Sequence, residues 1–320
     1  MRQVTLGTTG IQVGEIFFGA GSIGGIGSSA ATLGSGMATD EALERLDEAY
    51  ELGIRVIDTA NSYAGGESER VIGRWREERE HPDVIVETKV GNVVEKGQAG
   101  IDLSAEHIAR QLALSRSRLG TVDLYLSHAP DPSTPLEETI TAFAAAIDAG
   151  QIRAYGCSNL AVRDLEAVLV AADRAALPRP GWIQNQFSLA SRTDERDLLP
   201  LAAGEGLGYT AYSPLAGGVL AGRYSIDEEP AAGSRLAIAP RMYADAFTES
   251  TLSAVTRLNA IARERGVGTA ALALWWLLRH PSVTAPIVSP RRGSQWDAVT
   301  EALALEPDDA LFEQVGTLFA

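Results

Sequence analysis

Short apolar runs alternate with longer amphipathic segments along most of the chain. Buried strands are predicted at the apolar runs 16–18, 56–57, 84–88, 123–127, 152–156, 182–185, 208–212 and 284–288. Apolar residues with helical spacing predict helices at 39–52, 104–119, 135–149, 161–176, 195–204, 249–265, 268–279 and 294–304, followed by a terminal helix. Strands that alternate with helices are typical of a parallel sheet, so the pattern predicts an α/β fold.

Local signals refine this picture at three places. Arg2–Leu6 and Ile11–Val13 flank Gly7-Thr-Thr-Gly10, which predicts a small hairpin ahead of the strand at 16–18. Thr134-Pro-Leu-Glu137 predicts a capped helix start, with Thr134 as N-cap, proline at the first helical position and Glu137 as the capping glutamate. Segment 213–247 has no clear periodicity and is long for a connection, so it is a candidate lid or binding loop.

Eight strand–helix units without a linker between them predict one (β/α)8 TIM barrel domain over residues 1–320, with an N-terminal hairpin and extra C-terminal helices. The 320 residues exceed the roughly 250 that such a barrel needs, which leaves room for loop insertions.

Charge and composition exclude several classes of function. The formal net charge of −15 argues against a nucleic-acid partner, which would need clustered Lys and Arg. The longest apolar run, 270–278, is far shorter than the roughly 18 residues of a membrane span, and the N-terminus lacks the pattern of a signal peptide. A single cysteine, Cys157, cannot form an internal disulfide, which fits the reducing cytoplasm.

Ionisable side chains follow three neighbouring strands. Asp58 ends one strand and Tyr63 lies five residues later, Lys89 ends the next strand, and His128 ends the one after it. In a parallel barrel these strand ends open onto the face that carries the active site. Each residue alone has an ordinary structural explanation, but four such groups together would be costly to desolvate unless they partner one another. They are therefore the candidate active site.

Motifs at successive strand ends resemble the aldo-keto reductase family. They are Ile57-Asp-Thr-Ala-Asn-Ser-Tyr63, Thr88-Lys89, Ser127-His128, Gly156-Cys-Ser-Asn159, Ile183-Gln-Asn-Gln186, Ala211-Tyr-Ser-Pro-Leu-Ala-Gly-Gly218 and Pro286-Ile-Val-Ser-Pro-Arg291. His128-Ala-Pro-Asp131 and the residues after it look closest to the aflatoxin-aldehyde and succinic-semialdehyde reductase branch.

The resemblance implies NAD(P)H-dependent reduction of a small carbonyl substrate without a metal. Tyr63 would be the general acid, and Lys89 would lower the pKa of its phenol toward the operating range. Asp58 would pair with Lys89, and His128 would hydrogen-bond and orient the carbonyl oxygen.

The resemblance also implies a binding site for the cofactor. Ser158, Asn159 and Gln184 would hold the nicotinamide carboxamide, and Tyr212 would stack on the ring. The pyrophosphate would lie along Ser213, Leu215 and Gly217 with Arg223 as a clamp. The adenosine end would meet Ser289, Arg291 and Gln295, and Arg291-Arg292 in so acidic a chain favours NADPH over NADH.

Other readings compete with this one. Gly19-Ala-Gly-Ser-Ile-Gly24 matches the dinucleotide fingerprint of a Rossmann dehydrogenase, but glycine-rich loop follows it where a helix should begin. The four histidines lack the paired spacing of a metal site, and no G-x-S-x-G motif supports a serine hydrolase. An NADP(H)-binding barrel with a regulatory or redox-sensing role would keep the same motifs. The particular substrate, the physiological direction and the oligomeric state are not readable from the sequence.

Overall fold

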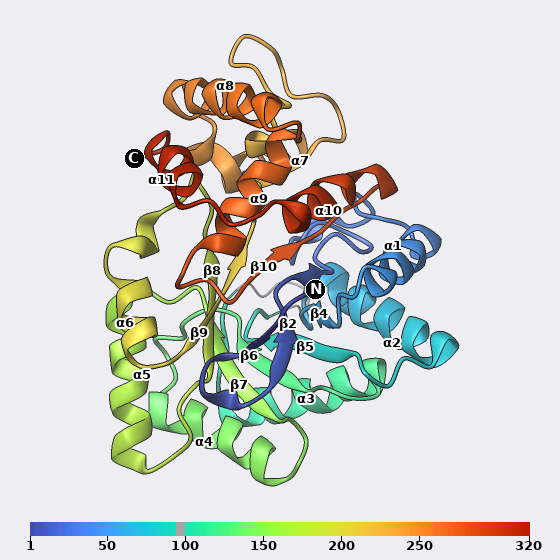
Figure 1. Ribbon diagram of the computed structural model, residues 1–320. Coiled ribbons are helices and arrows are strands. Elements are labelled where there is room, and N and C mark those ends of the chain that lie inside the picture. Colours follow the sequence, from blue (N-terminus) through green and yellow to red (C-terminus); the bar gives the residue numbers. More distant parts are fainter. Residues whose placement is uncertain (94–99) are drawn as a thin grey trace.

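Eight parallel strands form a closed barrel in the computed structural model, which describes residues 1–93 and 100–320 (Figure 1). Around the barrel the strands follow the order β10-β3-β4-β5-β6-β7-β8-β9. Their bounds are β3 (Phe17–Gly19), β4 (Val56–Asp58), β5 (Ile85–Val90), β6 (Leu124–Ser127), β7 (Ala154–Ser158), β8 (Trp182–Gln186), β9 (Gly208–Tyr212) and β10 (Ala285–Val288). The predicted (β/α)8 TIM barrel is confirmed.

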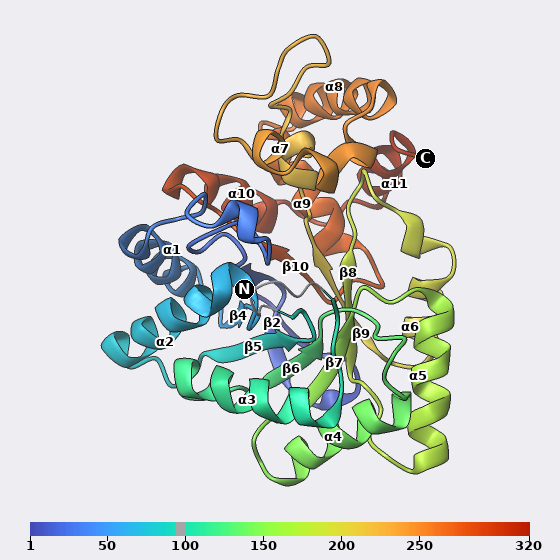
Figure 2. The ribbon, with the colours of Figure 1, turned by 180° about the vertical axis from the view of Figure 1, so that it is seen from behind.

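The described residues form eleven α-helices, most of which surround the barrel on its outer face (Figures 1 and 2). They are α1 (Thr39–Glu51), α2 (Glu67–Arg79), α3 (Ala105–Leu119), α4 (Leu136–Asp148), α5 (Val162–Ala175), α6 (Leu198–Gly204), the short α7 (Arg235–Ile238), α8 (Glu249–Glu264), α9 (Thr269–Arg279), α10 (Asp297–Ala304) and α11 (Asp309–Thr317). Most fall where the apolar periodicity predicts them.

Helix α2 was not predicted from the hydrophobic pattern. Its sequence is dominated by Glu and Arg, and only Val71, Ile72 and Trp75 give it an apolar stripe toward the sheet. Two further positions on its buried side, Ser68 and Glu69, are polar and hydrogen-bond to other elements. The helix is therefore held partly by polar contacts that hydrophobic periodicity does not register.

The start of α4 also differs from the prediction. The helix begins at Leu136 with Pro135 as its N-cap, and no side chain caps it. The hydroxyl of Thr134 instead donates to Asp131 Oδ2 at 2.6 Å. The predicted capping box is wrong because Asp131 competes for the Thr134 hydroxyl.

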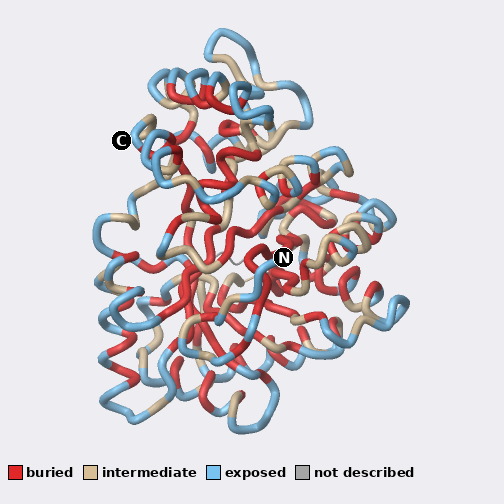
Figure 3. The backbone as a smooth tube through the Cα atoms, in the orientation of Figure 1, coloured by how far each residue is buried: buried red, intermediate tan, exposed pale blue. Residues whose placement is uncertain are grey.

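Buried side chains form one cluster inside the barrel and a larger one between the barrel and the helices. Buried residues lie along the barrel strands, and exposed residues lie mainly on the outer helices and loops (Figure 3). The inner cluster contains Phe17, Leu124 and Trp182 from the strands together with Leu6 and Val13 from the N-terminal hairpin. The amphipathic helices pack their apolar faces onto the outer cluster, as barrel architecture requires.

The predicted hairpin is confirmed as antiparallel β1 (Gln3–Thr5) and β2 (Gln12–Gly14), and it covers the N-terminal end of the barrel. At its tip, Gly7 has φ +50°, and a Cβ there would lie 2.0 Å from Gly181 O and 2.2 Å from Gly208 N. Only glycine fits this approach to the starts of β8 and β9. The C-terminal strand ends thus form the other mouth of the barrel.

The glycine-rich segment after β3 is a loop. Within the fully described residues 20–38 the chain makes one 3-10 turn, Ala30–Thr32, and α1 begins only at Thr39. The dinucleotide fingerprint needs a helix that starts at its last glycine, and it belongs to an open sheet. The Rossmann alternative is therefore wrong.

Candidate active site

Asp58 and Lys89 form a buried ion pair at the C-terminal ends of β4 and β5. Lys89 Nζ donates to Asp58 Oδ1 at 2.5 Å and to the backbone oxygen of Thr59 at 2.9 Å. A third, longer contact of 3.4 Å reaches the hydroxyl of Tyr63. The three donors of the ammonium are thus all directed at oxygen atoms.

Tyr63 begins the 3-10 turn Tyr63–Gly66 that follows β4. Its ring packs edge-on against His128, with centroids 5.6 Å apart, and Lys89 Nζ lies 5.1 Å from the Tyr63 ring centroid. Burial raises the pKa of the Tyr63 phenol, while the charge of Lys89 lowers it by less.

The expected net lowering of the Tyr63 pKa is therefore wrong, because burial outweighs the charge of Lys89. Asp58 compensates the Lys89 ammonium at much shorter range than Lys89 reaches Tyr63, and the charge of Asp58 itself raises the pKa of the phenol. The raised pKa means that the phenol keeps its proton at physiological pH, and this is the proton that a general acid must donate.

His128 directly follows β6 and faces Tyr63. Burial and the positive charge of Lys89 lower the pKa of His128 to about 3. Its imidazole is therefore neutral at physiological pH and can donate one N–H bond. Nδ1 of the ring lies 3.0 Å from Nδ2 of Asn92.

Glu87 is a member of this group that the sequence analysis did not select. It lies on β5 two residues before Lys89, so both side chains face the barrel interior, and Glu87 is completely buried. Gln184 reaches across the barrel from β8, and its Nε2 donates to Glu87 Oε1 at 2.6 Å and to Asp58 Oδ1 at 3.2 Å. Burial and the adjacent Asp58 carboxylate hold the pKa of Glu87 well above its usual range. A glutamate directly after the apolar run 84–86, two positions before Lys89 on the same strand, was the signal that could have identified it.

The residues predicted to meet the nicotinamide are linked by hydrogen bonds at the ends of β7, β8 and β9. Asn159 donates to the backbone oxygen of His128 at 2.7 Å and accepts from the hydroxyl of Tyr212 at 2.7 Å. Ser158 Oγ donates to the backbone oxygen of Gln184 at 2.7 Å. Asn159 has φ +59°, a strained conformation that this network helps to maintain. Ser158, Asn159, Gln184 and Tyr212 are thus brought together beside His128.

Tight turns after β9 carry the next predicted residues. Ser213 has φ +55° and Gly217 has φ +67°, while Leu215 lies between them. A Cβ at Gly217 would lie 2.7 Å from the ring of Tyr243, so glycine is required by space as well as by conformation. Arg223 is exposed, and it forms no ion pair with any described residue.

Three arginines gather at the end of β10. The guanidinium of Arg291 donates to the backbone oxygens of Gly233 and Ser35, each at 3.3 Å. Burial and then the charges of Arg235 and Arg292 lower the pKa of Arg291. Within the described part of the chain, no ion pair neutralises any of the three. Arg235, on α7 in segment 213–247, was missed because it is far from Arg291 in sequence.

The other residues predicted at this end support the same loop. Gln295 Oε1 accepts from the backbone N–H groups of Arg291 at 2.7 Å and Arg292 at 3.1 Å. Ser289 Oγ lies 2.8 Å from Ser22 Oγ, which ties the loop to the glycine-rich segment.

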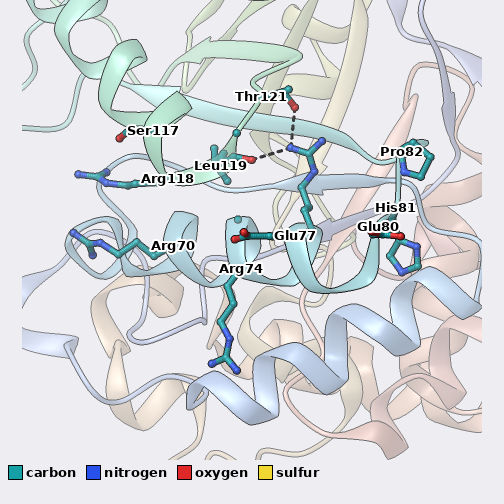
Figure 4. Close-up of a pocket in the computed structure, with 13 residues that line it drawn as sticks. Arg70, Arg74, Glu77, Glu80, His81, Pro82, Ser117, Arg118, Leu119 and Thr121 are labelled. Atoms are coloured by element: carbon teal, nitrogen blue, oxygen red, sulfur yellow. Dashed lines mark hydrogen bonds between the residues drawn. The ribbon is translucent and has the colours of Figure 1, made fainter.

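A groove of ≈ 1010 Å³ lies away from this mouth, between α2 and the end of α3 (Figure 4). Its arginines already have partners in the chain. Arg76 donates to Leu119 O at 2.9 Å and to Thr121 Oγ1 at 2.8 Å, and Arg118 donates to Glu69 Oε2 at 2.8 Å. The groove therefore offers a ligand little unpaired positive charge. The C-terminal strand ends are the better candidate site.

Two properties of residues 1–93 and 100–320 bear on other functions. None of the helices there is long and apolar enough to cross a membrane. The same residues contain no group of three or more His, Cys, Asp or Glu side chains that could hold a metal ion.

Comparison with known proteins agrees with the site. The Aldo/keto reductase family profile matches residues 15–318. The chain is 32% identical to a probable voltage-gated potassium channel subunit beta of Oryza sativa subsp. japonica, over 96% of this chain and 92% of that protein. It is 31% identical to an uncharacterized oxidoreductase of Bacillus subtilis, over 100% and 96% of the two chains. It is 30% identical to the L-glyceraldehyde 3-phosphate reductase of Escherichia coli K12, over 81% and 77%.

The buried Asp58–Lys89 pair, the phenol and the neutral imidazole thus occur in a chain whose profile match covers nearly its whole length. The chain belongs to the aldo/keto reductase family and is an NAD(P)H-dependent oxidoreductase that reduces carbonyl groups.

Proposed function

We propose that the protein reduces an aldehyde or ketone to an alcohol with NADPH as the hydride source and Tyr63 as the general acid. The observation that carries this proposal is the grouping of Asp58, Tyr63, Lys89 and His128 at one mouth of the barrel. This mouth is where (β/α)8 enzymes carry their active sites.

Each residue of the group has a defined task. NADPH, when bound, would be the source of the hydride for the carbonyl carbon. The Tyr63 hydroxyl would give its proton to the carbonyl oxygen. The phenolate that remains lies beside the Lys89 ammonium, which stabilises its negative charge. Asp58 holds Lys89 in place, and the neutral imidazole of His128 orients the carbonyl oxygen.

The residues at the rim fit a dinucleotide phosphate. Ser158, Asn159 and Gln184 would hold the carboxamide, and Tyr212 would stack on the nicotinamide ring. Because Nε2 of Gln184 is engaged by Glu87 and Asp58, Gln184 would act through its side-chain oxygen. Ser213, Leu215, Gly217 and Arg223 would line the pyrophosphate.

The adenosine end supports NADPH over NADH. Arg291 and Arg235 carry positive charges that repel each other, and a 2′-phosphate between them would relieve this repulsion. Ser289 and Gln295 would complete this end by fixing the loop.

Residues 1–320 would act as one catalytic domain on a small carbonyl compound, and the lone free Cys157 fits a cytoplasmic location. The alternative is a regulatory or redox-sensing barrel with little turnover. The similarity to a probable potassium channel subunit beta is the observation that supports this alternative. The grouping of all four proposed catalytic residues favours turnover instead.

The test is NADPH oxidation over a panel of aldehydes, ketones and keto-sugars. Tyr63→Phe should lose at least roughly a hundredfold in turnover, since that is the low end for general acid catalysis, while NADPH affinity stays nearly unchanged. Tyr50→Phe removes a phenol that hydrogen-bonds Asp83 on the protein surface, and this control should keep full activity. Near-normal turnover in Tyr63→Phe would exclude Tyr63 as the acid, and no turnover with any carbonyl would favour the regulatory alternative.

A further inference from the structure

Asn92 is the side chain that meets the Nδ1 edge of the His128 ring. It lies three residues beyond Lys89, in the loop after β5, and its Nδ2 is 3.0 Å from His128 Nδ1. The same amide nitrogen lies 3.2 Å from Ser28 Oγ and 3.5 Å from Ser62 Oγ. These two hydroxyls are themselves 2.7 Å apart.

The amide nitrogen of Asn92 faces Nδ1 of the ring, and this orientation indicates which nitrogen of His128 carries the proton. An amide nitrogen donates hydrogen bonds and does not accept them, so Nδ1 must accept through its lone pair. A neutral imidazole carries a single N–H, which must then be on Nε2. An imidazolium would set an Nδ1–H against the N–H groups of Asn92, so the contact also disfavours the charged form.

We propose that Asn92 is a positioning residue that holds His128 as its Nε2–H tautomer, so that His128 presents a hydrogen-bond donor to the carbonyl oxygen of the substrate. The part that concerns the substrate rests on the proposed function. The tautomer itself rests only on the contact between Asn92 and His128.

The tautomer decides whether His128 helps or hinders reduction. With the proton on Nδ1, the ring would turn a lone pair toward the carbonyl oxygen, and two acceptors would face each other. Removing one preorganised donor to a developing oxyanion typically costs about a hundredfold to a thousandfold in rate. The residue that orients the other ring nitrogen therefore has an effect on catalysis without touching the substrate.

Asn92→Asp is the informative variant because it keeps the size of the side chain and replaces the donor with an acceptor. A carboxylate at this position would accept a hydrogen bond from Nδ1–H, so the neutral ring would lose its proton from Nε2. The new negative charge would also favour the imidazolium, which carries both protons.

The primary measurement is long-range ¹H–¹⁵N NMR of the full chain with ¹⁵N-labelled histidine, which distinguishes the two tautomers. His128→Asn identifies the His128 signals among those of the four histidines. The wild type should show the Nε2–H form, and Asn92→Asp should show Nδ1–H or the imidazolium. The Nδ1–H form in the wild type, or an unchanged Nε2–H form in Asn92→Asp, would overturn the proposal.

The pH dependence of turnover is a second measurement. A purely structural role of Asn92 would not change the shape of this pH profile. In Asn92→Asp the imidazolium still has its Nε2–H, so turnover should persist at low pH and fall as pH rises through the new pKa of His128. The loss should reach about a hundredfold when the ring is neutral. A uniform loss at every pH would count against the proposal.

Ser28→Ala is the matched control, because it removes another partner of the same Asn92 nitrogen and leaves the contact with His128 in place. It should keep the Nε2–H tautomer and the wild-type pH profile. If Asn92→Asp does not fold, the wild-type NMR measurement still decides the tautomer. If the wild type shows Nε2–H but reduces no carbonyl, the proposed function fails while the assignment of Asn92 stands.

Discussion

The ammonium of Lys89 lies 2.5 Å from the carboxylate of Asp58, and both side chains are almost completely withdrawn from solvent, with 1% and 6% exposed. A buried ion pair gains little over apolar packing, but losing one partner leaves the other charge uncompensated. We therefore expect stability and catalysis to depend on Lys89 in different ways, so that mutation can separate the two effects.

Lys89→Met should reduce turnover as severely as Tyr63→Phe, because the Tyr63 phenolate loses the charge that stabilises it. It should also lower the free energy of unfolding by about 3–5 kcal/mol, since Asp58 is left buried and unpaired. Adding Asp58→Asn should restore much of the stability without restoring turnover. Urea unfolding and steady-state kinetics of the two variants measure both effects, and recovery of activity in the double variant would contradict the role of Lys89.

Glu87→Gln should change how stability depends on pH. The pKa of Glu87 is raised in the folded state, so above its unfolded pKa the folded chain retains a proton that the unfolded chain has released. The contribution of this proton to the free energy of unfolding is fully present below the pKa that Glu87 has in the unfolded chain. It is lost as pH rises toward the pKa of Glu87 in the folded protein, by up to about 1.4 kcal/mol per pH unit.

Glutamine cannot titrate, so Glu87→Gln should gain stability relative to the wild type between pH 5 and pH 8. Urea unfolding at both values checks this. Glu137→Gln replaces an exposed carboxylate on α4 and should show no such trend. A difference between wild type and Glu87→Gln that stays constant with pH would mean that Glu87 is ionised in the folded protein.

NADPH should bind more tightly than NADH, and Arg291→Ala should remove most of that preference. A charge-assisted bond to phosphate is worth about 1.5–3 kcal/mol, or roughly ten- to a hundredfold in relative affinity. Arg235→Ala should act in the same direction because the two guanidinium groups lie near each other. Arg196→Ala, an 86% exposed side chain paired with Asp197, is the control.

The measurement is the ratio of the dissociation constants of the two cofactors at fixed ionic strength. A ratio near one in the wild type, or one that does not move in Arg291→Ala, would mean that Arg291 does not contact the 2′-phosphate.

Segment 213–247 should become more protected from hydrogen exchange when NADPH binds. It contains the 3-10 turns Ala216–Ala221 and Pro240–Ala246 and the short α7, but most of residues 222–233 are exposed. An exposed stretch such as 222–233 has little packing of its own and opens easily. Helix α5, on the outside of the barrel, should exchange equally with and without NADPH. Equal protection of 213–247 in both states would argue against a lid.

The sequence by itself determined the order of strands and helices and the four catalytic candidates. Apolar runs and helical periodicity are local properties, and Asp58, Lys89 and His128 each stand at the end of such a run. Because parallel strand ends share one mouth of a barrel, local order was enough to bring these residues together. Helical periodicity did not predict helix α2, because charged residues dominate its sequence and its buried side is partly polar.

Only the tertiary structure decided which of the remaining polar groups join the site. Gln184 meets Glu87 across the barrel. Asn92 meets His128 from the loop after β5, and Arg235 comes near Arg291 from segment 213–247, which follows the neighbouring strand β9. These contacts join residues that are far apart in sequence, so no local sequence pattern predicts them. The pKa of Tyr63 is decided in the same way, because burial and the Asp58–Lys89 distance exist only once the barrel has closed.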